Sequence, residues 1–247
     1  MSIIRFFITS LVILLSFGAN AYAQDKPNCA GTDTACILAL LETKAASISE
    51  DSWRDSTYRE VAKLMTAQGN TEQALALIPR IKNPDTKAMT IRGIGMEAAK
   101  LKLSPNAYTS LWGKLRVEAD KIEHPPSYAI ALTYIAMAQA FAADDAGAMK
   151  TAAAMENAAL RNKAYAETAE IQAARGDIKA VTASIAAIND AAFRDKAYMT
   201  VAKLFADRKF YNQAFTSAVS IENNFQESQA LLYILAKQIT PEEVSLQ

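Results

Sequence analysis

Apolar residues recur through most of the chain at the three- and four-residue spacing that places them on one face of an α-helix. Tyr198, Val201, Ala202 and Phe205 show this pattern, which is typical of an amphipathic helix packed on one side. A turn signal such as Gly69-Asn70 then precedes a second, shorter apolar stretch. Glycine suits a helix C-terminus, and asparagine suits the N-cap of the next helix. The pattern therefore predicts pairs of helices and an all-α fold.

These helix pairs repeat at a near-constant interval. A small residue recurs at the same place in each first helix, and we take it as the anchor of the alignment. Successive anchors are 33, 41, 33, 33 and 34 residues apart: Ala62, Gly95, Ala136, Ala169, Ala202 and Ala236. One pair cannot bury its apolar faces alone, so neighbouring pairs are expected to stack. We expect about five helical hairpins in residues 51–240, with a 33–34-residue period and one longer unit.

The longer unit and the two ends have signals of their own. Ser104-Pro105 predicts a helix start, and the prolines of His124-Pro125-Pro126 are expected to break that helix. Between them lie the candidate buried residues Leu111, Trp112, Leu115, Val117 and Ile122. Residues 34–49 and 229–239 are predicted to form N- and C-terminal capping helices. Three related segments are predicted as turns before first helices: Arg54-Asp55-Ser56-Thr57, Arg161-Asn162-Lys163-Ala164 and Arg194-Asp195-Lys196-Ala197.

Residues 1–23 have the organisation of a signal peptide. Arg5 supplies a positive start, an apolar run follows from 6 to 17, and Ala21-Tyr22-Ala23 has the small-x-small pattern of a cleavage site. We expect a cut after Ala23 and a periplasmic or secreted protein, with a retained N-terminal anchor as the alternative. After cleavage no stable membrane insertion is expected, because no second long apolar segment follows.

The two cysteines, Cys29 and Cys36, follow the predicted cut. An exported chain meets an oxidising compartment, where such a pair is usually a disulfide. Closing so short a loop contributes roughly 2–3 kcal/mol by chain-entropy arguments. Zinc is disfavoured because the chain has one histidine. We expect a cap segment with this disulfide at 24–50, the repeat domain at 51–240 and a tail at 241–247.

Composition narrows the possible partners. The chain of 247 residues has 26 Lys+Arg and 26 Asp+Glu, so it lacks the basic field that holds nucleic acid. Hydrophobic residues make up 51% of it, interrupted by only eight glycines and seven prolines. This composition is typical of a closely packed helical protein.

The residues of the repeat resemble those of the tetratricopeptide (TPR) family. Tyr58, Val61, Ala62, Gly69 and Ala74 follow the family order of aromatic, apolar, small, turn glycine and second-helix alanine. The resemblance covers roughly residues 51–240. It departs from the family where the closing proline of each repeat is missing and where Val181 replaces the second-helix alanine. The resemblance implies a right-handed α-solenoid.

In the resembled family, a groove is lined by first-helix residues that point away from the second helix. Carried over by register, the candidates are Arg59, Lys63, Arg92, Met96, Tyr134, Met137, Phe141, Glu167, Glu170 and Lys203. The same register adds Glu60, Met89, Lys100, Ile130, Lys163 and Met199. An apolar patch on such a face is typical of a protein or peptide site. The alternatives are packing on neighbouring repeats for the apolar residues and a solvated face for the charged ones.

Catalytic signals are few. His124 stands alone, and Gly93-Ile94-Gly95-Met96-Glu97-Ala98 matches a dinucleotide fingerprint but falls in a predicted helix with no strand before it. The carboxylate pairs Asp144-Asp145 and Glu242-Glu243 are expected to be solvated. We expect no cofactor, no metal and no enzyme activity.

The leading hypothesis is an exported scaffold that binds another exported protein or a peptide. The first alternative is an enzyme acting on cell wall or a small molecule through carboxylates such as Glu167 and Glu170. The second is a self-associating structural protein.

Overall fold

The computed structural model of the chain describes residues 29–240. The predicted signal peptide, its cut after Ala23, the start of the cap segment and the tail at 241–247 lie outside the described residues. Within them, twelve α-helices and one 3₁₀-helix (η1) are found and no strand, which confirms the all-α prediction. The helices are α1 (Thr34–Ala46), α2 (Asp51–Ala67), α3 (Thr71–Leu75), η1 (Ile78–Arg80), α4 (Pro84–Lys100), α5 (Pro105–Asp120), α6 (Pro125–Phe141), α7 (Asp145–Ala153), α8 (Ala158–Ala174), α9 (Ile178–Ala186), α10 (Ala191–Asp207), α11 (Tyr211–Ala218) and α12 (Asn224–Ile239).

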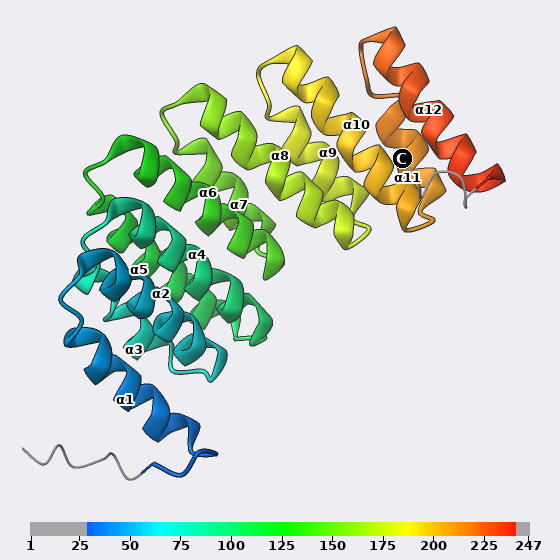
Figure 1. The fold of residues 1–247 in the computed structure, drawn as a ribbon. Helices are drawn as coiled ribbons and strands as arrows, with labels where there is room; N and C mark the ends of the chain where they lie inside the picture. Colours follow the sequence, from blue (N-terminus) through cyan, green and yellow to red (C-terminus); the bar gives the residue numbers. More distant parts are fainter. Residues whose placement is uncertain (1–28, 241–247) are drawn as a thin grey trace, which may run out of the picture.

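Five long helices of equal length form the frame of the fold. The helices α2, α4, α6, α8 and α10 each have 17 residues. Their first residues are 33, 41, 33 and 33 positions apart, the spacing of the anchors. Each long helix packs on the next long helix, and α10 packs on α12. Figure 1 shows these helices side by side in chain order along an arc.

The shorter helices form a second layer. Each of α3, α5, α7, α9 and α11 contacts both the long helix before it and the long helix after it. The helix α3 has only five residues and is followed by η1, which contains Pro79. A proline ring clashes with the carbonyl four residues earlier in an α-helix, here that of Leu75, so α3 ends at this residue. The helix α5 has 16 residues and accounts for the longer unit.

Each turn between a long helix and the following short helix contains one residue with a left-handed backbone. Positive φ angles occur at Gly69, Lys102, Ala143, Gly176 and Lys209. Each lies seven residues after an anchor, so we count register positions from the anchor and call this position +7. Only glycine adopts this conformation without a side-chain penalty. Three units therefore carry a residue that strains the turn.

We expect Ala143→Gly and Lys209→Gly each to raise the free energy of unfolding by about 0.5–1 kcal/mol. The native φ of both residues is 63°. Glycine removes the conformational penalty that an L-residue has there, and the greater freedom of glycine in the unfolded chain offsets only part of this gain. Urea unfolding followed by circular dichroism measures the change. The reverse substitution Gly69→Ala should destabilise the protein, although a Cβ there meets no atom within 4 Å. A loss of stability in both glycine variants would contradict the argument.

The three predicted basic-polar turns in fact lie within the first two turns of helices α2, α8 and α10. The arginine at position −8 donates from its guanidinium to the carbonyl six residues earlier, which closes the preceding loop. The pairs are Arg54 with Ile48 at 3.3 Å, Arg161 with Met155 at 2.7 Å and Arg194 with Ile188 at 3.2 Å. The prediction was wrong because these polar side chains satisfy backbone groups of neighbouring loops while their own backbone stays helical.

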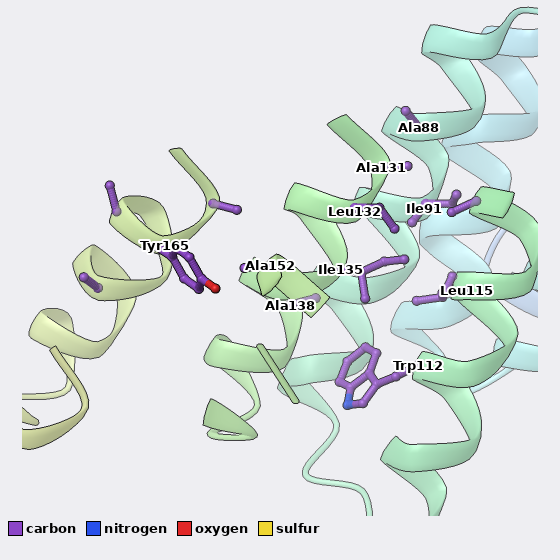
Figure 2. Close-up of a cluster of buried hydrophobic side chains, with 14 of the residues drawn as sticks. Ala88, Ile91, Trp112, Leu115, Ala131, Leu132, Ile135, Ala138, Ala152 and Tyr165 are labelled. Atoms are coloured by element: carbon purple, nitrogen blue, oxygen red, sulfur yellow. The ribbon is translucent and has the colours of Figure 1, made fainter. Parts of the chain in front are cut away.

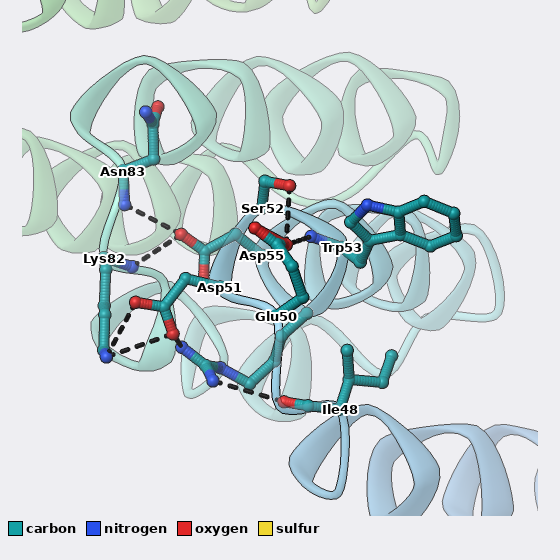
Figure 3. A network of polar contacts seen from close by, with 9 residues as sticks. Ile48, Glu50, Asp51, Ser52, Trp53, Asp55, Lys82 and Asn83 are labelled. Carbon is teal, nitrogen blue, oxygen red and sulfur yellow. Dashed lines mark hydrogen bonds and ion pairs between the residues drawn. The ribbon is translucent and has the colours of Figure 1, made fainter.

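The acid or amide at position −7 holds the loop that leads into the next long helix. Asp55 accepts hydrogen bonds from the backbone N–H groups of Lys82 (2.9 Å) and Asn83 (2.8 Å). Figure 3 shows this network, in which Asp51 also contacts Lys82. Asp195 accepts from Glu222 (2.9 Å) and Asn223 (3.0 Å) in the same way. Both carboxylates are buried. One recurring side chain therefore joins consecutive units.

The buried core runs along the row between the two layers. The anchors Ala62, Ala136, Ala169 and Ala202 are fully buried, and Gly95 is buried as well. Figure 2 shows the section of the core between α4, α5 and α6, where Ile91, Leu115 and Ile135 meet. Small residues at the anchors let neighbouring helices approach closely: a Cβ on Gly95 would meet Ala138 of α6 and Leu115 of α5.

The helix α5 confirms most of the expectation for the longer unit. Ser104 caps it by accepting from the backbone N–H of Ala107 at 3.3 Å. Leu111, Trp112, Leu115 and Ile122 are buried, but Val117 is 54% exposed and was wrongly assigned to the core. Pro125 and Pro126 do not interrupt α5, which ends at Asp120; they form the first turn of α6. Proline is tolerated there because the first helical N–H groups have no partner in the helix.

The two ends of the row also follow the sequence closely. The predicted N-terminal helix is α1, and the disulfide Cys29–Cys36 lies at its start. The C-terminal helix α12 begins five residues earlier than expected, because Asn223 caps it. Among the described residues, no helix has both the length and the apolar character that crossing a bilayer requires.

Candidate binding surface

The predicted groove residues lie at four recurring positions of the long helices: about −6, −3 or −2, +1 and +5 from the anchor. Position +1 alone carries Lys63, Met96, Met137, Glu170 and Lys203 in successive helices. These positions are exposed or half-buried, whereas the anchor beside them is buried. The structure therefore arranges the candidates as a strip along one face of the row, and they differ in what they contact.

The N-terminal part of this strip is hollowed between α2 and α4. A hollow of about 340 Å³ is lined by Arg59, Glu60, Lys63, Met89, Arg92, Gly93, Met96 and Glu97. Its floor is open because Gly93 has no side chain; a Cβ there would meet only Lys63, at 3.6 Å. Six of the eight lining residues were predicted from the register. Met89 and Met96 line the hollow together with these cations, and flexible methionine side chains suit a surface that adapts to a ligand.

The charges around this hollow are only partly paired. Arg59 forms an ion pair with Glu60 at 2.9 Å, and Lys100 forms one with Glu97 at 2.9 Å. Lys63 and Arg92 have no ion-pair partner among the described residues. Two cations therefore face the hollow with their charge available to a ligand.

Sequence reasoning missed three contributors to this region: Gly93, Glu97 and Trp53. Gly93 lies at position −2, where Glu60 lies in α2, and was passed over because it lacks a side chain. Trp53, which is 72% exposed, lines an adjoining hollow of about 470 Å³ that shares Arg59 and Glu60 with the first. An exposed tryptophan at the start of α2 is the signal that could have indicated it.

The apolar candidates of α6 lie next along the strip. The ring of Tyr134 stacks under the guanidinium of Arg92, at 5.3 Å from its carbon to the ring centre. Met137 is half-buried against a small cluster that contains Ala136, Ala140, Ala148 and Ile171. Phe141 and Ile130 are exposed. The structure therefore joins Tyr134 to the hollow, while Met137 is largely used in packing.

The candidates of α8 and α10 make a different surface. Glu167 lies 3.7 Å from Lys163, and Glu170 is half-buried three residues further on. Burial raises the pKa of the Glu170 carboxyl, and the neighbouring carboxylate of Glu167 raises this pKa further. The ammonium of Lys203 lies over the ring of Tyr233, 5.1 Å from its centre. The strip is thus basic at α2 and α4 and acidic at α8.

The raised pKa of Glu170 makes stability depend on pH with a definite sign. Between the usual and the raised pKa, the folded chain binds a proton more readily than the unfolded chain, so stability falls as the pH rises through this interval. We expect Glu170→Gln to be more stable than the parent at pH 7 and to lose that advantage near pH 4. Thermal unfolding at several pH values tests this, with exposed Glu60→Gln as control. An advantage independent of pH would contradict it.

His124, the single histidine, is not part of a nucleophilic site. It occupies the N-cap position of α6, and its Nδ1 lies 2.6 Å from the Ser127 hydroxyl, which donates to Asp85. In a catalytic triad the histidine lies between serine and carboxylate and takes the serine proton. Here the fully buried serine lies in the middle and ties the start of α6 to α4.

The remaining chemical candidates have structural roles. The fingerprint Gly93–Ala98 lies inside α4, so it lacks the strand and turn that dinucleotide binding requires. Asp144 caps α7, and Asp145 pairs with Arg175 at 2.7 Å, so the expectation of free solvated charges was wrong for both. Glu242 and Glu243 lie outside the described residues. Within residues 29–240, no group of three or more His, Cys, Asp or Glu is placed to hold a metal.

Comparison of the chain with family models, curated proteins and solved structures found no match in any of the three. The resemblance to tetratricopeptide repeats therefore depends on the residues quoted for it.

Proposed function

We propose that this chain is an exported, TPR-like, right-handed solenoid of about five helical hairpins that binds a segment of another exported protein or peptide. The proposal is supported by the equal long helices and by the left-handed residue at position +7 of each unit. The observation that carries the binding role is the hollow between α2 and α4 with two unpaired cations. The disulfide Cys29–Cys36 supports export, because such bonds persist in oxidising compartments.

The chemistry of the strip defines the segment it would take. Lys63 and Arg92 favour a carboxylate in the hollow, and Met89 and Met96 favour an apolar side chain beside it. Further along the strip, Glu167 and Glu170 favour a cation, which would relieve the cost of keeping Glu170 charged while half-buried. The expected ligand is an extended segment with an acidic and apolar end over α2 and α4 and a basic end over α8.

Filling the hollow is the direct test. We expect Gly93→Phe to weaken binding at least about tenfold, because the ring would occupy the space between Lys63 and Met96. Peptides selected from a displayed library on the parent protein supply the ligand, and fluorescence anisotropy measures affinity. The matched control is Gly113→Phe, since Gly113 is also within a helix and a Cβ added there would meet no atom within 4 Å.

The outcomes separate the hollow from the rest of the strip. Equal affinity of the parent and Gly93→Phe would overturn the assignment of the hollow. The double variant Tyr134→Ala/Phe141→Ala then reports whether binding lies over α6 instead. A selection that enriches no peptide would remove the binding role itself.

A further inference from the structure

The described residues begin with a short helix, α1, and end with a long helix, α12, so each end has one of the two helices of a unit. Each unit consists of a long helix followed by a short helix. The helix α12 has the register of a long helix, since it begins 33 residues after α10 and Asp195 holds the loop before it as Asp55 holds the loop before α4. The residue of α12 at the anchor position is therefore Leu235, one residue before the Ala236 of the sequence alignment. No short helix follows α12 within the described residues.

The helix α12 has exposed apolar residues at positions that a short helix would cover. In the five long helices before it, the anchor and position +3 are buried in every case, and position +4 is buried in four of them. In α12 these positions carry Leu235, Gln238 and Ile239; all three are exposed, Leu235 by 51% and Ile239 by 74%. Retention of apolar side chains at these positions is the mark of an interface rather than of a polar end cap.

The last short helix leaves a matching gap. Met149, at position +13 of α7, faces the next short helix, since its sulfur lies 3.2 Å from the Ser184 hydroxyl of α9. In α11 position +13 is Phe215, which is 54% exposed. Phe215, Leu235 and Ile239 therefore outline the seat of one further short helix.

The first helix, α1, has the register of a short helix. The loop after it is closed by Arg54 on the carbonyl of Ile48, just as Arg161 and Arg194 close the loops after α7 and α9. The helix α1 packs on α2 as the other short helices pack on the long helix that follows them. No long helix precedes α1 within the described residues.

The face that α1 would turn to a long helix is also open. Position +12 is fully buried in α3, α7, α9 and α11, but its counterpart Leu41 is partly exposed. Position +19 is buried in the same four units, but its counterpart Ile48 is partly exposed. The described residues thus begin with a short helix that has no long helix before it.

We propose that α1 of one copy occupies the seat beside α12 of a second copy, so that copies associate head to tail. We call this contact between α1 of one copy and α12 of the next the joint. It repeats the contact between the long and the short helix that already occurs within each unit. In two such units, position +15 of the short helix bonds position +3 of the long helix: Thr151 donates to Gln139 at 2.7 Å, and Ser184 donates to Gln172 at 2.8 Å.

This register specifies which residues meet across the joint. Position +15 of α1 is Lys44, and position +3 of α12 is Gln238, the equivalent of Gln139 and Gln172. The ammonium of Lys44 can donate to the amide oxygen of Gln238, as the hydroxyls of Thr151 and Ser184 donate to those two glutamines. The open positions of α12 carry no charge, so no like-charge repulsion opposes the contact. Because the two joined surfaces differ, the contact leaves both outer ends free and further copies can add.

Cysteine cross-linking tests the joint without disturbing the fold, since Lys44 and Gln238 are both exposed. Lys44→Cys and Gln238→Cys are prepared separately in the chain from Gln24 onward, then mixed under mild oxidation. The mixture is expected to give at least about tenfold more disulfide-linked dimer than either variant alone. Val117→Cys, also exposed but on α5, replaces Lys44→Cys in the control mixture.

Sedimentation over a concentration series gives an independent measure. The mass of the parent should rise with concentration, and Leu235→Glu/Ile239→Glu should weaken association at least about a hundredfold, because two apolar side chains are lost from the joint. Mixed variants that cross-link no more than the control would overturn the proposal. So would a parent that stays monomeric up to about 1 mM. Efficient dimerisation of Gln238→Cys alone would overturn it in favour of α12 pairing with a second α12.

Discussion

Gly95→Leu is expected to lower the free energy of unfolding by about 3 kcal/mol or more, among the largest effects of any single change in this protein. Gly95 lies in the contact between α4 and α6. Even a Cβ at this position would lie 2.8 Å from the Cβ of Ala138 and 3.7 Å from a methyl carbon of Leu115. Both neighbours belong to packed helices, so neither can move away without opening the core. Urea unfolding followed by circular dichroism measures the loss.

A size exchange between the two helices provides the control. Gly95→Ala alone is expected to cost about 1–3 kcal/mol through the clash with Ala138. Adding Ala138→Gly removes the atom in conflict, so the double variant should be more stable than the sum of the two single effects predicts. Strict additivity would show that the contact between these two residues does not limit the approach of α4 and α6.

Asp195→Ala is the second large effect, with an expected loss of about 2–4 kcal/mol. The buried carboxylate accepts from two backbone N–H groups, those of Glu222 and Asn223, and alanine leaves both without this acceptor. Asp195→Asn should have a smaller effect. The amide at the equivalent Asn162 still accepts from the N–H of Asn189, although at 3.4 Å. Denaturant unfolding measures both variants.

The matched control is Asp207→Ala, which removes a carboxylate on the same helix. Asp207 pairs with Lys237 at 2.9 Å on the surface, where such pairs contribute about 1 kcal/mol or less. A loss for Asp195→Ala no larger than that for Asp207→Ala would contradict a role of Asp195 in joining consecutive units. Asp55→Ala should repeat the large effect at the other end of the row.

Local signals predicted most of the helices and the spacing between units. Apolar periodicity and small anchors are properties of one helix and its immediate packing, so they can be read from adjacent residues. The same signals failed where a side chain acts on another unit. Asp55 and Asp195 looked like turn residues, although each binds backbone groups 27 and 28 residues away. Val117 looked like a core residue, although α5 is exposed on that side.

The candidate site was predicted only as a strip. The register placed Arg59, Lys63, Arg92 and Met96 on one face, and the structure shows that they surround a common hollow. The sequence register could not distinguish Met137, which packs on a buried cluster, from Phe141, which is exposed. Which of two neighbouring positions is covered depends on the angle between helices, and that angle is set by residues of several units together.

The sequence by itself determined that the chain is helical, where its long helices recur, and which small residues lie at their contacts. These properties follow from the 3.6-residue period and from backbone preferences that act over a few residues. Only the tertiary structure decided that a hollow opens between α2 and α4, that Glu170 is half-buried beside Glu167, and that α1 and α12 each present an uncovered face. Those features depend on how much of each helix its neighbours cover, which is a property of the assembled row and of no single segment.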